Sequence, residues 1–167
     1  MTVKNACFAL GVVVSSLGLA THTAHAEQSI IKDPDRHPQY VFEAEPHFLL
    51  APLGGQPLPG AGFRGTFVLV PNGFIHSIND SVGLGFGVDW TRDNTWLPIV
   101  MQWNFWLSEH WSVFGEPGGS FHFQDNGRRD RADFTLYGGA RLRFSDRATL
   151  TFRVGHPALS VGFSFLI

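Results

Sequence analysis

Hydrophobic and polar positions alternate along most of the chain after residue 39. Residues 81–92 show the alternation most clearly, since glycines and Asp89 take turns there with large apolar residues: Val82, Leu84, Phe86, Val88 and Trp90. A period of two indicates an extended strand with one apolar face. Repeats of this pattern, separated by turn-like segments, predict eight strands near 40–52, 61–71, 81–92, 96–107, 110–123, 133–144, 148–155 and 159–167.

The eight predicted strands indicate an all-β fold, an antiparallel up-and-down barrel over residues 40–167. No apolar run approaches the roughly 20 residues of a membrane helix, whereas most segments reach the ~9–11 residues of a tilted membrane strand. If the chain crosses a membrane, it therefore does so as a closed barrel. Pro46, Pro98 and Pro117 lack the N–H that a strand donates, and they predict bulges or strand ends.

Alternation alone does not decide which face of the barrel points outward. A soluble, lipocalin-like barrel would turn the bulky apolar face inward, and a membrane barrel would turn it toward lipid. The other face is mostly glycine, serine and threonine, which suits a narrow eight-stranded interior. It also carries four acidic and four basic residues: Glu43, Glu45, Asp89, Glu116, Arg64, Arg141, Arg143 and Arg153. Since buried charges must be paired, this balance favours an internal charge network and a transmembrane barrel, with the soluble barrel as the alternative.

Composition agrees with lipid on the outside of the barrel. Lys4 and Lys32 are the only lysines, whereas a water-facing surface usually carries many. Four of the five tryptophans are expected near strand ends, in the aromatic girdles of a membrane barrel: Trp90, Trp96, Trp106 and Trp111.

Residues 1–26 predict a cleaved secretory signal peptide. A short apolar run is followed by Ala24-His25-Ala26, which has the small-x-small pattern of a signal-peptidase site. The only cysteine, Cys7, lies inside this segment, so the mature chain is expected to have no disulfide or thiol chemistry.

Residues 27–39 are polar and contain two prolines, and they predict a flexible periplasmic extension. The mature chain has 11 basic and 14 acidic residues, a formal charge of −3. This mild acidity argues against nucleic-acid binding, which needs a basic face.

The chain ends in an apolar strand without a polar tail. Ser160, Gly162, Phe165 and Ile167 resemble the C-terminal assembly signal of bacterial outer-membrane β-barrels. With the strand pattern before it, the chain resembles the small outer-membrane barrels of the OmpA, OmpX and OmpW type. The resemblance implies export through the periplasm, insertion by the barrel-assembly machinery and a place in the outer membrane of a Gram-negative cell. It identifies no functional residue, and we expect a monomer with both termini in the periplasm.

Other candidate sites are weaker. Ser120 and His122 lie about 7 Å apart on one strand face, as in barrel enzymes that modify lipid A or phospholipid, but the sequence shows no third group to orient the histidine. The outer loop 124–132 is basic, and three of its arginines are candidates for lipopolysaccharide contact, with a solvated loop as the alternative: Arg128, Arg129 and Arg131. The histidines form no metal-type pair, so no metal or cofactor is expected.

We therefore expect a non-enzymatic integral outer-membrane barrel with a structural or interaction role and a lumen plugged by the charge network. The first alternative is a narrow, OmpW-like channel for small apolar solutes, which requires an apolar tunnel. The lower alternative is an enzyme that modifies lipid A or phospholipid. Outer-membrane lipid and lipopolysaccharide are the expected partners in each case.

Overall fold

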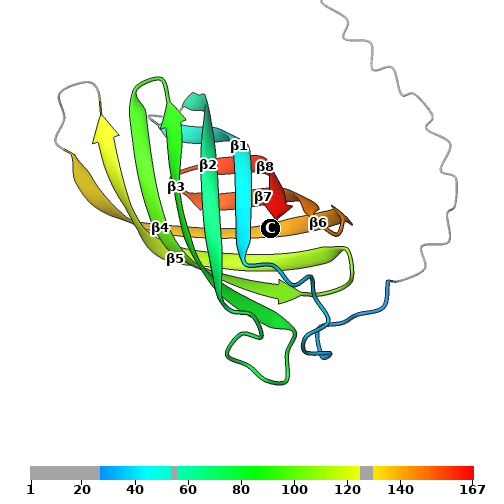
Figure 1. Cartoon of the computed structure of the whole chain (residues 1–167). Coiled ribbons are helices and arrows are strands. Elements are labelled where there is room, and N and C mark those ends of the chain that lie inside the picture. The colour runs from blue at the N-terminus through cyan, green and yellow to red at the C-terminus, as the bar shows by residue number, and fades with distance from the viewer. Residues whose placement is uncertain (1–26, 54–55, 125–129) are drawn as a thin grey trace, which may run out of the picture.

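Eight antiparallel strands close into a barrel (Figure 1). The computed structural model describes residues 27–53, 56–124 and 130–167, so the predicted signal peptide lies outside the described residues. Each strand pairs with the next one in the sequence, and β1 pairs with β8. The strands are β1 (Phe42–Leu53), β2 (Gln56–Val70), β3 (Asp80–Thr91), β4 (Asn94–Trp106), β5 (Trp111–Gln124), β6 (Arg131–Ser145), β7 (Ala148–His156) and β8 (Leu159–Leu166). The predicted all-β, up-and-down barrel is confirmed; we call the end that carries both termini the periplasmic end and the opposite one the outer end.

The main difference from the predicted strands is at the outer end of β2. The sequence predicted a loop over 54–60, because this segment is rich in glycine and proline, but β1 and β2 stay paired up to Leu53 and Gln56. The pairing of β2 with β3 begins only at Gly60 and Thr91. The first residues of β2 therefore form a local sheet edge, where proline is tolerated because no ladder bond needs its missing N–H.

Three prolines lie inside strands rather than at bulges or strand ends: Pro46, Pro98 and Pro117. On both sides of each proline the paired strands keep the same register, so no extra residue is inserted there. The register shifts lie elsewhere, between Val68 and Val70 in β2 and between Arg143 and Ser145 in β6. The prediction of bulges at these prolines was therefore wrong.

Large apolar side chains cover the outside of the barrel, and polar side chains fill the inside. Strand β8 shows the rule, because its residues alternate between exposed and buried along its whole length. Every strand contributes to the exposed apolar surface: Phe48, Phe67, Leu84, Ile99, Val113, Phe134, Val154 and Phe163 are examples. A continuous apolar surface of this kind requires an apolar surrounding medium. Among the described residues, no helix is long and apolar enough to cross a membrane.

The tryptophans divide between the two faces of the barrel wall. Trp90 and Trp111 are exposed near opposite ends of the barrel, as expected for aromatic girdles. Trp96 and Trp106 are instead buried, with exposed fractions of 2% and 3%. Both occupy inward-facing positions of β4, so the girdle prediction, which considered only nearness to strand ends, was wrong for these two.

Residues 27–39 contact the periplasmic end of the barrel. Ile30 is buried, and its backbone N–H donates to the carbonyl of Leu107 at 3.0 Å. The N–H of Asn79 donates to the carbonyl of Ile31 at 2.8 Å. The sequence suggested a flexible extension because the segment has no hydrophobic period; contacts made by single residues leave no such period.

The substitution Ile99→Arg tests the outward orientation of the apolar face. Ile99 lies near the middle of β4 and is 51% exposed. We expect the free energy of unfolding in phospholipid vesicles to fall by about 2–4 kcal/mol, because an arginine at this depth has to leave water. The control Asp93→Arg, in the exposed β3–β4 turn, should change it by less than about 0.5 kcal/mol. Equal stability of Ile99→Arg and the unmodified protein would contradict a lipid-facing position.

Candidate functional site in the barrel lumen

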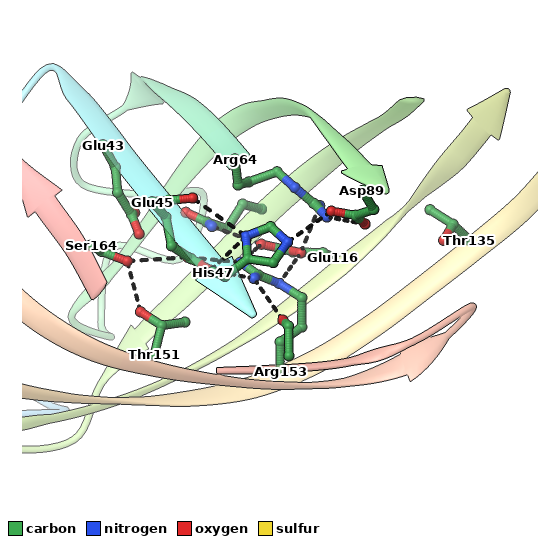
Figure 2. A network of polar contacts seen from close by, with 12 residues as sticks. Glu43, Glu45, His47, Arg64, Asp89, Glu116, Thr135, Thr151, Arg153 and Ser164 are labelled. Atoms are coloured by element: carbon green, nitrogen blue, oxygen red, sulfur yellow. Dashed lines mark hydrogen bonds and ion pairs between the residues drawn. The ribbon is translucent and has the colours of Figure 1, made fainter. Parts of the chain in front are cut away.

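Arg153 of β7 is the centre of an ion-pair network inside the barrel (Figure 2). Its Nη1 and Nη2 donate to the two carboxylate oxygens of Glu45 at 2.6 and 3.1 Å. Its Nε and Nη2 donate to the two carboxylate oxygens of Glu116 at 2.9 and 3.1 Å. None of the three side chains is more than 1% exposed. The planar guanidinium fork serves two carboxylates at once, which a lysine ammonium does not match.

Arg64 and His47 extend this cluster into a closed ring. Arg64 lies 3.4 Å from Glu116 and 3.2 Å from Asp89. The Nε2 atom of His47 lies 2.8 Å from Asp89 Oδ1, and its Nδ1 lies 3.7 Å from Glu45 Oε1. We call these residues the central ring, six side chains from five strands: Glu45, Arg153, Glu116, Arg64, Asp89 and His47.

A second polar layer lies between the central ring and the periplasmic end. The Nη2 atom of Arg141 lies 2.9 Å from Glu43 Oε1, and its Nη1 donates to the side chain of Asn104. Asn104 donates to Gln102 at 3.2 Å, and Gln102 donates to Glu116 at 2.8 Å. The two amides therefore connect the second layer to the central ring.

The aromatic ring of Phe114 lies beside two of the arginines. The guanidinium carbons of Arg141 and Arg153 are 4.4 and 5.2 Å from its centroid. A cation over an aromatic face is stabilised electrostatically, and more so when both groups are shielded from water. Phe114 thus gives both guanidinium groups a favourable neighbour in addition to their carboxylates.

Glycines on the inward face make room for these long side chains. A Cβ atom added at Gly162 would lie 2.7 Å from the Cβ of His47 and 3.0 Å from the Cγ of Glu45. One added at Gly62 would lie 2.6 Å from Asp89 Oδ1. A larger residue at either position would displace members of the central ring, so the small inward residues are a packing requirement of the network.

Seven of the eight charged residues predicted for the lumen lie in these two layers, and Arg143 does not. The Arg143 side chain is 20% exposed, pairs with exposed Asp146, and donates from Nε to the carbonyl of Glu109 at 2.7 Å. It sits where β6 shifts register, between Arg143 and Ser145. Arg143 still pairs with Thr149 in the register of the preceding residues, so its parity is inward as predicted, but it lies two residues from the end of β6 and therefore at the periplasmic rim.

Three residues of the network were not identified from the sequence: His47, Gln102 and Asn104. His47 lies two positions after Glu45 in the same strand and therefore faces the same side. That parity was the available signal, but a lone histidine is more often a rim or surface residue. With Arg143 absent, the lumen holds four acids and three arginines, and His47 lies beside two of the acids.

An apolar cluster fills the lumen toward the outer end: Leu49, Ala51, Trp96 and Ala158. His122 stacks on Trp96 with ring centroids 4.8 Å apart, and its Nε2 lies 2.8 Å from Asn94 Oδ1. Asp133, which the sequence reasoning did not connect with this histidine, lies 3.7 Å from Nδ1. Both ring nitrogens therefore face groups other than Ser120.

The arginines predicted to contact lipopolysaccharide lie only partly within the described residues. Arg131 is exposed and its Nε donates to Asp133 at 2.7 Å, whereas Arg128 and Arg129 lie outside the described residues.

The residues of the predicted assembly signal lie in β8 and at the residue that follows it. Ser160 and Gly162 face the lumen, while Phe165 faces outward. Ile167 is exposed, and its carbonyl accepts hydrogen bonds from the backbone N–H groups of Val41, just before β1, and Phe42, the first residue of β1. No group of three or more potential metal-ligating residues occurs among the described residues.

No protein-family model and no curated protein matches the chain. Its structure is similar to a de novo designed transmembrane β-barrel, with TM-score 0.53 and 11% identity over 80% of this chain and 99% of that one. It is also similar to the outer membrane protein Ail of Yersinia pestis in a phospholipid bilayer nanodisc, with TM-score 0.50 and 10% identity over 77% and 100% of the two chains. For Neisserial surface protein A the TM-score is 0.48 and the identity 11%, over 77% and 97%.

The chain has the fold of a small transmembrane β-barrel. This confirms the predicted resemblance to eight-stranded outer-membrane barrels and removes the soluble, lipocalin-like alternative. At about one identical residue in ten, the likeness concerns the fold alone.

Two arginines with different surroundings test the energetic weight of the central ring. We expect Arg153→Gln to lower the free energy of unfolding by about 3–5 kcal/mol, because two buried carboxylates lose their common partner. Arg143→Gln should lower it by less than about 1 kcal/mol, since its ion pair is open to solvent. Urea unfolding in phospholipid vesicles, followed by tryptophan fluorescence, measures both. If both variants lower the free energy of unfolding by the same amount, burial in the central ring does not increase the contribution of Arg153 to stability.

Proposed function

We propose that this protein is an integral outer-membrane protein with a closed lumen and a structural or interaction role. The apolar outer surface supports a membrane location, and the fold shared with the outer membrane protein Ail supports the outer membrane. The observation that carries the closed lumen is the central ring, because its buried side chains from five strands meet across the interior.

The central ring opposes the passage of ions and of apolar solutes for different reasons. An ion would have to displace charge-assisted hydrogen bonds between side chains that are at most 3% exposed. An apolar solute would have to enter a layer of charged groups to which it offers no hydrogen bond. The geometry therefore favours a plug over a channel for small apolar solutes.

The surroundings of His122 do not favour a lipid-modifying enzyme. A serine nucleophile needs a base within hydrogen-bond reach, and His122 directs its Nε2 to Asn94 and stacks on Trp96. We propose that this protein contacts outer-membrane lipid without modifying it chemically. Outer-membrane lipid covers the apolar surface, and Arg131 is an exposed cation at the outer end that suits lipopolysaccharide phosphate.

Single-channel recording in planar bilayers tests the closed lumen. We expect no steady conductance of porin size from the unmodified protein. A steady porin-sized current through the unmodified protein would refute the plug.

Two phenylalanines of β8 test the assembly signal. Phe163 and Phe165 both face outward, but only Phe165 belongs to the predicted signal. We expect Phe165→Asn to reduce the amount of folded, heat-modifiable protein in the outer-membrane fraction several-fold and to leave it in the periplasm. Phe163→Asn should reduce this amount much less. If the two variants accumulate equally, the signal is not located at Phe165.

A further inference from the structure

The N-terminal segment reaches from one side of the periplasmic mouth to the other. At its downstream end, the N–H groups of Val41 and Phe42 donate to the carbonyl of Ile167 at 2.8 and 3.0 Å, beside the contact of β1 with β8. At its upstream end, Ile30 donates to Leu107 in the β4–β5 turn. In a closed barrel of eight consecutive strands, the β4–β5 turn lies half a circumference away from the β1–β8 pair. The chain between these points therefore reaches from the β1–β8 side of the periplasmic end to the β4–β5 side.

The path runs over the lumen rather than around the outside of the barrel. His37 stacks on Trp106, with ring centroids 5.4 Å apart and an angle of 10° between the ring planes. Trp106 faces inward and is 3% exposed. The Nδ1 atom of His37 also lies 2.6 Å from the side chain of Asn79, which is fully buried. A residue that covers an inward-facing tryptophan lies above the interior.

The upstream end is wedged between two periplasmic connections. Ile30 bonds to Leu107 in the β4–β5 turn, and Ile31 accepts from Asn79 at the end of the β2–β3 connection. Ile30 is only 1% exposed, so its side chain is removed from water at this junction. Burying a residue of this size is worth about 1.5–3 kcal/mol. This part of the segment is therefore held by packing as well as by backbone hydrogen bonds.

Glu27 fastens the far end of the segment. Its carboxylate accepts from the Ser108 hydroxyl at 2.8 Å and from the backbone N–H of His110 at 3.0 Å, and it lies 2.6 Å from His110 Nδ1. The side-chain hydrogen bond with His110 holds the pKa of the Glu27 carboxyl below its usual value. Arg36 also contacts Glu109 at 3.2 Å, but this ion pair is half exposed and therefore weak. Glu27 and His37 thus fasten the segment through polar and stacking contacts, in addition to the packing of Ile30.

We propose that residues 27–41, which we call the strap, are a lid over the periplasmic mouth of the barrel: Pro38–Val41 lead from β1 to the β4–β5 side, where Glu27 and His37 fasten the segment. The strap separates the second polar layer of the lumen from the periplasm. This inference is independent of the proposed plug, because it concerns access from one end and not passage through the central ring. A barrel without the plug could have a strap, and a plugged barrel could lack one.

A single cysteine below the strap tests the proposal. The chain has no cysteine after Cys7, so Ser112→Cys introduces the only thiol of the mature protein. Ser112 faces inward near the periplasmic end of β5 and is 1% exposed. Its hydroxyl makes no hydrogen bond, and its cross-strand partners are Trp106 and Arg141. The measurement is the rate at which a charged, water-soluble thiol reagent modifies this cysteine in the folded protein in detergent micelles.

Removing the side-chain contacts of both Glu27 and His37 should expose the cysteine introduced at Ser112. In E27A/H37A we expect modification of the Ser112→Cys thiol to be about tenfold faster or more, because a covered thiol reacts only through local opening. The control D33A/R36A changes two exposed residues of the same strap and should stay within about twofold. Equal rates with and without the fastenings would overturn the lid. Heat-modifiable migration verifies that each variant is folded.

A cross-linking test covers the case in which E27A/H37A does not fold. Because the side-chain tips of Glu27 and His110 touch, a short bifunctional thiol reagent should join the cysteines of E27C/H110C in the folded protein. The matched pair E27C/D146C places the second cysteine in the exposed β6–β7 turn, on another part of the rim, and should stay unlinked. Equal cross-linking of the two pairs would overturn the position of the strap.

Discussion

The pairing of Arg153 with Glu45 and Glu116 is the constraint on which the rest of the barrel depends. A guanidinium in this narrow interior has no bulk water to solvate it, so carboxylates must surround it. Those carboxylates need further cations, which Arg64 and His47 supply, and the ring needs glycine where side chains approach the wall. With charged and small residues inside, the large apolar residues are left for the outside. The inverted surface and the filled lumen therefore have one physical cause.

The same ring ties the two ends of the sheet together. Glu45 and Arg153 are 108 positions apart in the sequence, and their strands become near neighbours only when β8 has paired with β1. An open eight-stranded sheet would separate Glu45 from Arg153 in an apolar environment, although Arg153 could keep its pairing with Glu116 of β5. The ionic interior thus favours closure over an open or partly inserted sheet. Contacts of such long sequence separation form late in folding, which makes completion of the ring a final step of assembly.

The period-two pattern was sufficient to predict the strand order, the closed barrel and most of the inward-facing charges. The pattern assigns a side to each residue but not its depth along the barrel axis. Arg143 has the predicted inward parity but lies at the rim, and Trp96 and Trp106 were placed by nearness to strand ends instead of by parity. The strap had no pattern to detect, since Ile30 and His37 act as single residues on surfaces that other parts of the chain create. Contacts of this kind follow from the assembled barrel and not from a local period.

The β1–β2 hairpin extends past its neighbours at the outer end, and this has a consequence for how one barrel meets another. The pairing of β1 with β8 ends at Leu50, and that of β2 with β3 ends at Gly60, so both strands present free edges in water beyond these points. A free edge is a template for a strand from another molecule. Pro52, Pro57 and Pro59 remove backbone donors from this tip, so an incoming strand finds an incomplete set of partners. The prolines thus make this tip a poor template for extending the sheet with a strand from another molecule.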